Sequence, residues 1–185
     1  MRVLLAISRL IDSVNEWVGR VVLWLVVPMV AVGAYNAIGR SLDKTVGTRL
    51  ASNTYFELQW YLFSLIFLLM VGYVLKHDSH IRVDVVYARL SERGQAWVNM
   101  LGSILFLVPF ALVLFYVSLP LVAFSVQVRE VSSDAGGLPR WPLKLMMLPA
   151  FILLALQGFS EFIKNLAFLR GALPHPPHKA RREVA

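Results

Sequence analysis

The residues whose types and spacing could do chemistry gather at positions 77–84, where His77, His80 and Asp84 lie close together. On a helix, positions three and four apart share a face, and zinc sites use such spacings. A structural zinc site takes four ligands, however, and the sequence supplies no second cluster. The same charges also suit a chain that is leaving a bilayer. We prefer that interpretation and predict no metal site.

Residue types argue against other chemistries as well. The sequence holds no Cys, which excludes thiolate nucleophiles, disulfides and thiolate-held iron–sulfur clusters. The four His, at 77, 80, 175 and 178, lie outside the apolar segments, whereas membrane haem proteins take axial ligands from their helices. Ionisable residues inside those segments are sparse, which disfavours a proton relay or ion pathway. We therefore predict no catalytic residue and no cofactor.

The elements that would carry any such site are apolar helices. Of the 185 residues, 58% are hydrophobic and 16% charged, which is typical of a membrane protein. About 20 apolar residues span the hydrocarbon layer, and four segments qualify: 17–38, 56–75, 96–124 and 143–167. The third is long enough to be tilted or to end in a turn near Pro120. Gly33, Ala34, Ala37 and Gly72 could permit close helix contact. The predicted fold is an all-α membrane protein with one four-helix domain, 1–170.

The distribution of Lys and Arg predicts the orientation. Twelve of the 18 lie in the amino-terminal end, in residues 76–93 and in the carboxyl-terminal end, and six lie in the other two connectors. Because cytoplasmic loops carry the excess, both termini are predicted to be cytoplasmic. The net charge of +7 is scattered between apolar blocks, so nucleic acid is not an expected partner.

Residues outside the spans have their own patterns. Residues 80–93 place Ile81, Val85 and Ala88 in one row, which predicts an amphipathic helix lying in the membrane interface. Residues 171–185 are proline-rich and basic, which predicts a disordered cytoplasmic tail. Positions 32–34 resemble a signal-cleavage site, but the long apolar run and an acidic upstream region favour a retained helix.

Polar residues at the helix ends are the remaining candidates for contacts. Glu57 opens the second segment, where the helix dipole favours a carboxylate. It is interpreted as an ordinary terminal charge, or as a partner of Arg40 or of a neighbouring chain. Residues 136–144, GGLPRWPLK, predict a turn followed by a helix start. Residues 157, 161 and 165 form a polar stripe that contacts a partner or meets headgroups and water.

Several of these elements resemble the small membrane subunit of tripartite ATP-independent periplasmic (TRAP) transporters. That family shows an acidic residue early in its second helix and an H-I-R-V-D-like exit, matched here by Glu57 and by residues 80–84. Arg40 at the end of the first helix and the G-G-x-P-x-W-P-like sequence at 136–142 also fit. The resemblance covers about residues 8–168, and HIRVD is its most specific part.

The resemblance implies four transmembrane helices in the bacterial inner membrane and a non-enzymatic role. A periplasmic binding protein would deliver an organic anion, usually a carboxylate, to a large Na⁺-coupled subunit, which this chain would brace. The expected partners are that large subunit, the binding protein and membrane lipids. The candidate contact residues are Arg40, Glu57, Trp60, His80, Arg82, Asp84, Arg140 and Trp141.

A second functional class stays open, namely a stand-alone four-span membrane enzyme or electron carrier. It would need a chromophore, a metal or a cluster of buried polar groups. The sequence favours the accessory subunit, because it predicts a bundle without buried ionisable groups or broken helices, which are the usual marks of a transport site.

Overall fold

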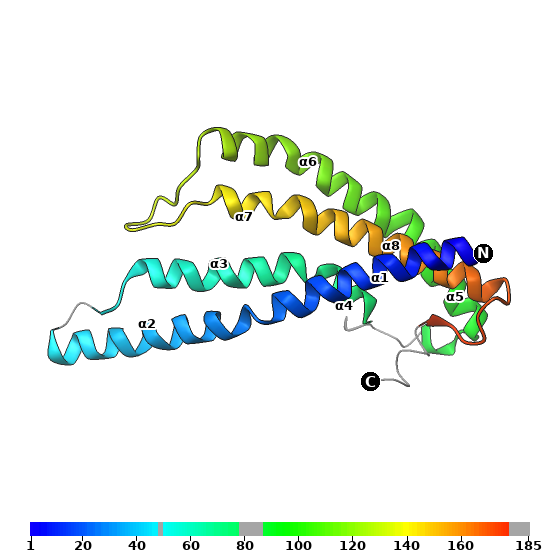
Figure 1. Ribbon diagram of the computed structural model, residues 1–185, viewed down its shortest axis with the longest axis horizontal. Helices are drawn as coiled ribbons and strands as arrows, with labels where there is room; N and C mark the ends of the chain where they lie inside the picture. The colour runs from blue at the N-terminus through cyan, green and yellow to red at the C-terminus, as the bar shows by residue number, and fades with distance from the viewer. Residues whose placement is uncertain (48–49, 78–86, 178–185) are drawn as a thin grey trace.

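The computed structural model describes residues 1–47, 50–77 and 87–177, which fold into helices and one isolated β-bridge (Figure 1). The α-helices are α1 (Arg2–Leu23), α2 (Val26–Val46), α3 (Asn53–Leu69), α4 (Val71–Lys76), α5 (Glu92–Leu101), α6 (Val108–Gln127), α7 (Trp141–Leu145) and α8 (Met147–Leu169). A 3₁₀ turn, Tyr87–Arg89, precedes α5, and a π-helix, Gly102–Leu107, joins α5 to α6.

Three continuous stretches among the described residues are long and apolar enough to cross a membrane: Arg2–Thr45, Glu92–Gln127 and Trp141–Leu169. They contain the first, third and fourth predicted segments. The second predicted segment, 56–75, coincides with α3 and α4, which meet at Met70, and its crossing stays a prediction. The all-helical, membrane-type fold predicted from composition is therefore confirmed.

Several helix boundaries differ from those predicted. The first helix begins at Arg2, well before residue 17, so the polar residues ahead of the apolar run are helical too. Pro120 lies inside α6, so the alternative of a turn at that position is wrong. A proline removes one backbone hydrogen bond, a loss that transmembrane helices tolerate when the freed groups find other partners. The expected helix start is confirmed at Pro142, in the first turn of α7, and the expected turn before it is confirmed at Gly136, which has a positive φ.

Residues 80–86, the first half of the predicted interfacial helix 80–93, lie outside the described residues. Its described half holds the turn Tyr87–Arg89, then Ser91, which caps α5 by accepting a hydrogen bond from the Gly94 N–H, and residues 92–93, which begin α5. In the predicted tail, residues 171–177 begin with Gly171, which has a positive φ, and Pro176 is fully buried. Within this described part of the tail, residues 176–177 pack against the protein, whereas residues 171, 172, 174 and 175 are exposed.

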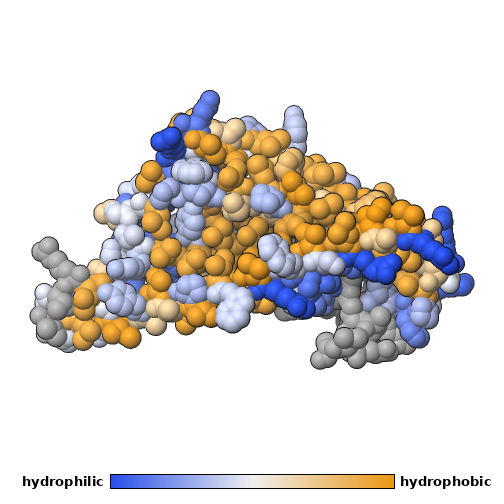
Figure 2. Space-filling model, in the orientation of Figure 1, coloured by the Kyte–Doolittle hydropathy of each residue, from blue (hydrophilic) through white to orange (hydrophobic). Residues whose placement is uncertain are grey.

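The helices form two antiparallel pairs joined near one end (Figure 1). In one pair α2 lies along α3, and in the other α6 lies along α7 and α8, while α1 packs on both α8 and α4. The end of α2, residues 50–52 and the loop 128–140 lie at the opposite end from the N-terminus. Apolar residues cover most of the visible face (Figure 2). Such exposure fits a chain whose surroundings are lipid and other subunits.

Glycines set the close approach of α1 to α4. A Cβ on Gly72 would lie 2.0 Å from the Asn15 Oδ1, and one on Gly19 would lie 2.2 Å from the Tyr73 ring. Each helix thus presents a glycine to a side chain of the other. On α2, a Cβ on Gly33 would lie 2.8 Å from the Gln59 amide. Close contact at Gly33 and Gly72 was predicted and is confirmed, whereas Gly19 was not recognised from the sequence.

We predict that Gly19→Ala destabilises the bundle, because its methyl group would overlap Tyr73. Overpacking of this kind costs about 1–3 kcal/mol. The midpoint of thermal unfolding in detergent, followed by circular dichroism, should fall by several degrees. Gly102→Ala is the matched control, since no atom lies within 4 Å of its added Cβ. Equal unfolding midpoints for the two variants would contradict the close contact between Gly19 of α1 and Tyr73 of α4.

Candidate functional site

The first polar cluster is a seam between the first and last helices of the described chain. Ser8, Asp12 and Asn15 lie along one side of α1, at spacings of four and three residues that keep them on one face. They meet a matching row on α8. We call the whole set the α1–α8 polar seam: Ser8, Asp12, Asn15, Gln157, Ser160, Glu161 and Lys164.

Asp12 is the centre of this seam. Its Oδ1 accepts hydrogen bonds from the Ser160 hydroxyl at 2.7 Å and the Gln157 amide at 3.0 Å. The Lys164 ammonium lies 3.1 and 3.0 Å from the two carboxylate oxygens and also donates to Glu161 at 2.7 Å. Charge-assisted bonds of this kind are about twice as strong as neutral ones. Asp12 therefore fixes α1 to α8 by one ion pair and two further hydrogen bonds.

At the two ends of the seam, uncharged side chains of α1 and α8 form hydrogen bonds with each other. The hydroxyls of Ser8 and Ser160 lie 2.7 Å apart, and the Asn15 amide donates to the Gln157 side-chain oxygen at 2.9 Å. All four residues are nearly or fully buried. Buried polar groups cost free energy unless they are hydrogen-bonded, so these pairs specify the register of α1 on α8.

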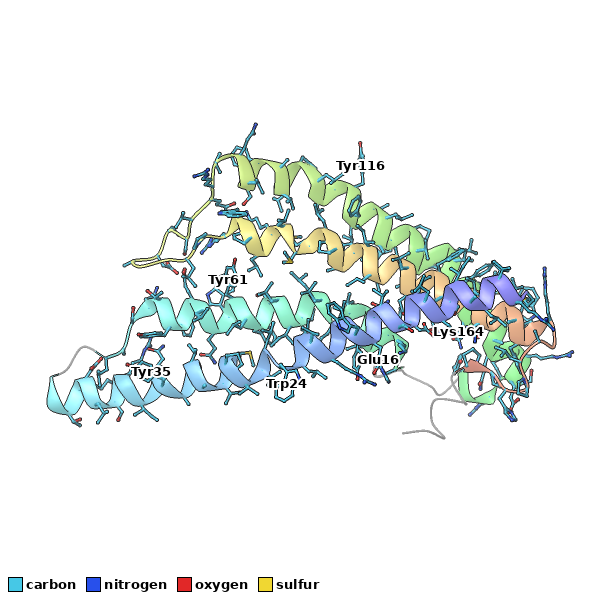
Figure 3. All side chains as sticks on the ribbon, viewed as in Figure 1. Glu16, Trp24, Tyr35, Tyr61, Tyr116 and Lys164 are labelled. Atoms are coloured by element: carbon cyan, nitrogen blue, oxygen red, sulfur yellow. The ribbon has the colours of Figure 1, made fainter. Side chains whose placement is uncertain are left out.

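Glu16 extends the polar contacts to α4. It accepts from the Lys76 ammonium at 2.7 Å, the His77 ring at 2.8 Å and the Arg20 guanidinium at 2.9 Å. Lys76 also donates to the backbone carbonyl of Asp12 at 3.1 Å. Figure 3 labels Glu16 on α1 and Lys164 on α8, both in the half of the molecule that holds the N-terminus. The helix α1 is thus the common partner of α4 and α8.

These contacts correct two sequence-based interpretations. The polar stripe at 157, 161 and 165 faces the protein interior, since Gln157, Glu161 and Asn165 are all buried, and Gln157 binds α1. The bundle also holds buried ionisable groups, Glu57 and Glu161, and interrupted helices, so their predicted absence is wrong. The polar residues of α1 were overlooked because they precede the apolar run, although their spacing already indicated a helical face.

A second cluster, the loop anchor, ties the 130–140 loop to the start of α3. Glu57 is 2% exposed and accepts hydrogen bonds from the Ser132 hydroxyl and the Leu138 N–H. The Arg140 guanidinium donates to the Ser132 hydroxyl oxygen at 3.0 Å and lies 6.0 Å from the centre of the Trp60 ring. The anchor is therefore built from Glu57, Trp60, Ser132, Leu138 and Arg140.

Backbone contacts give this loop a defined shape. A β-bridge joins Val131 to Pro139, and the Arg140 N–H donates to the Glu130 carbonyl at 2.8 Å. The Thr54 hydroxyl of α3 donates to the Gly136 carbonyl at 2.8 Å. A carboxylate that accepts backbone and hydroxyl donors fixes loop geometry in the way that a helix cap does. The loop is thus held on α3 at two points.

The predicted contact residues divide into three groups. Glu57, Trp60 and Arg140 come together in the loop anchor, which no spacing rule predicted because Leu138 lies 81 residues from Glu57. Arg40 is exposed on α2, with its guanidinium 5.8 Å from the centre of the Phe56 ring, and Trp141 begins α7, next to Arg140. His80, Arg82 and Asp84 lie outside the described residues.

An ion pair joins the 130–140 loop to α7. The Lys144 ammonium of α7 donates to the Glu130 carboxylate at 2.5 Å, and both side chains are 27% exposed. This contact holds the pKa of the Glu130 carboxyl below its ordinary value. The pair connects the loop to the start of the α7–α8 stretch.

The fold and these clusters define a helical membrane protein in which internal polar contacts join helices and fix a loop. A family model, described as "Tripartite ATP-independent periplasmic transporters, DctQ component", matches residues 29–168. The chain belongs to this family, so it is a small permease component of a TRAP transporter, as the resemblance predicted. Membership implies association with other transporter components. No curated protein and no solved structure matches the chain.

We predict that Lys164→Met destabilises the fold by about 1–3 kcal/mol, because it leaves Asp12 without its cation. The side chains are 14% and 20% exposed, so solvent offsets part of the cost. Thermal unfolding in detergent should show a midpoint lower by roughly 2–8 °C. Arg20→Met, at a side chain that is 73% exposed, should change it little. Adding Asp12→Asn to Lys164→Met should recover part of the loss, and additive losses would argue against the pair.

The Glu130–Lys144 pair predicts a pH dependence of a definite sign. Because folding lowers the pKa of the Glu130 carboxyl, the pair stabilises the fold above the unfolded carboxyl pKa of about 4.3 and is lost as pH falls through the lower folded value. The difference in unfolding midpoint between the unmodified chain and Glu130→Gln should therefore shrink between about pH 6 and about pH 3. Lys144→Met should reproduce the effect. A difference that is constant with pH would contradict it.

Proposed function

We propose that this chain is the small permease subunit that braces the large Na⁺-coupled subunit of a TRAP transporter. The large subunit would import an organic anion of the carboxylate class, which a periplasmic binding protein delivers. The observation that carries the proposal is the family match over 140 residues, 29–168. The chain would act without enzymatic chemistry in the bacterial inner membrane.

The internal contacts support a bracing role. The ion pairs of Asp12 with Lys164 and of Glu16 with Lys76 connect one helix to another, as expected of groups that hold a bundle together. Moving subunits need a partner that resists deformation, and close-packed, hydrogen-bonded helix contacts provide such resistance. The broad apolar exterior, including Phe106 and Tyr116 at 74% exposure, gives surface for both lipid and a protein partner.

Four spans with both termini in the cytoplasm complete the proposal. The stretch formed by α3 and α4 would be the second span, and it runs antiparallel to α2 (Figure 1). An even number of crossings returns the chain to its starting side, in agreement with the excess of Lys and Arg at both ends. The seam would then lie toward the cytoplasm and the loop anchor toward the periplasm.

The candidate subunit contacts take two roles in this proposal. Glu57, Trp60 and Arg140 act by positioning the 130–140 loop, whose residues 133–136 are exposed. Arg40 and Trp141, together with His80, Arg82 and Asp84, would meet the other subunits directly. The two roles differ experimentally, since only the first set should change the stability of the isolated chain.

The proposal is tested by co-expression with a TRAP-type large permease from the same genome. An affinity tag on this chain should recover the large permease. Proteoliposomes that hold both chains, a sodium gradient and the cognate binding protein should take up a labelled carboxylate. Vesicles with the small chain alone should show no uptake above empty vesicles. Sodium-driven uptake by the isolated chain would overturn the proposal, as would a tightly bound chromophore or redox metal in its absorption spectrum and metal analysis.

A further inference from the structure

A polar recess opens between α1 and α4. It has a volume of about 460 Å³ and is lined by side chains that include Arg9, Asp12, Glu16, Arg20 and Lys76. Its carboxylates are already engaged with protein donors, since Glu16 accepts from Lys76 and Arg20 and Asp12 accepts from Lys164. The recess therefore presents donors to solvent more than acceptors.

The arginines of the recess keep donor capacity for an anion. Arg20 gives its Nε to Glu16, and Arg9 gives its Nε to the Leu5 carbonyl. A guanidinium carries five N–H donors in a planar fork that suits phosphate oxygens, and both side chains lie on the exposed surface. Charge complementarity thus points to a phosphate group.

An apolar groove lies directly beside this recess. It has a volume of about 420 Å³ between α1, α3 and α8, and its lining includes Trp17, Val18, Val21, Leu69, Pro149 and Ile152. These are apolar side chains of the helices that would cross the membrane. A hydrocarbon chain is the ligand that such a groove accommodates, because its apolar lining offers van der Waals contact and no hydrogen-bond partner.

Trp17 joins the two surfaces. Its side chain lines both the polar recess and the apolar groove, and it is 68% exposed. Tryptophan is favoured where an apolar layer meets a polar one, because its ring is apolar and its N–H can find a polar partner. Along α1, the charged residues up to Arg20 thus give way to the apolar residues from Val21 onward within one turn.

We infer that this composite surface is a specific binding site for a phospholipid of the bilayer. The phosphate would lie in the recess against Arg9 and Arg20, and an acyl chain would follow Trp17 into the groove beside Val21. The lipid would fill the space between α1 and α8 next to the α1–α8 polar seam, and its contacts would help to hold the two helices together. Binding to the isolated chain does not rest on the proposed transporter role, whereas the identity of the occupant in the assembled complex does.

The test is native mass spectrometry of the purified full chain in detergent, titrated with four probes. Phosphatidylglycerol and phosphatidylcholine with the same acyl chains should both bind. Diacylglycerol with those chains lacks the phosphate and should bind at least tenfold more weakly, the ratio expected for losing about 1.4 kcal/mol of charge-assisted bonding. Inorganic phosphate, which lacks the chains, should not bind measurably. Diacylglycerol that binds as tightly as the phospholipids would overturn the inference.

Matched variants separate the two halves of the site. Arg9→Gln with Arg20→Gln should weaken phospholipid binding about tenfold or more, and Arg93→Gln, an exposed arginine on α5, should not. Val21→Trp should fill the groove and weaken binding, whereas Val27→Trp, at a 61% exposed position on α2, should not. Circular dichroism checks that each variant is folded. Equal losses in variants and controls would show non-specific lipid association and overturn the site.

A crosslink identifies the occupant in the assembled complex. The sequence has no Cys, so Val21→Cys gives a single thiol inside the groove. In the complex with the large permease, this thiol should react with a maleimide attached to a phospholipid acyl chain. If the Val21→Cys thiol instead formed a disulfide or a bifunctional crosslink to the permease, a protein segment would cover the groove. The inference would then fail.

Discussion

The pairing of Asp12 with Lys164 is the constraint on which the rest of the structure depends. A carboxylate and an ammonium that are largely removed from water destabilise a fold unless each finds a partner of opposite charge. The helix α1 therefore has to lie against α8 at a fixed position along the helix axis, although Lys164 is 152 residues from Asp12 in the sequence. Ser160 and Gln157 then complete the bonding of the Asp12 oxygens, which fixes the rotation of both helices as well as their distance.

Once α1 is fixed on α8, the position of α4 follows. Glu16 lies one turn beyond Asp12 and holds Lys76 and His77, while Gly19 and Gly72 let the backbones of α1 and α4 approach. At the other end of the α3–α4 stretch, Glu57 holds the 130–140 loop. Polar contacts thus fix that stretch at both ends.

This distribution of polar and apolar contacts supports the bracing role that we propose for the chain. Polar bonds in a water-poor environment are directional and specify one arrangement of the helices. The apolar stretches between them leave a groove lined by Trp17, Val21 and Ile152. We infer that a phospholipid fills this groove, so that the bilayer itself would contribute to the rigidity of the subunit.

The sequence by itself determined the class of the protein and much of its secondary structure. Apolar length predicts the spans, Pro142 and Gly136 predict the entry to α7, and the elements at Glu57 and residues 80–84 predict the family. Only the tertiary structure decided which residues meet, namely Asp12 with Lys164 and Glu57 with Ser132 and Leu138. The physical reason is that helical periodicity shows which residues share a face, but not which helix that face meets. In a membrane the helix faces toward lipid and toward protein are both apolar, so the apolar pattern does not show which faces pack together. The partners of the few polar residues are set by packing between segments that are far apart in the sequence.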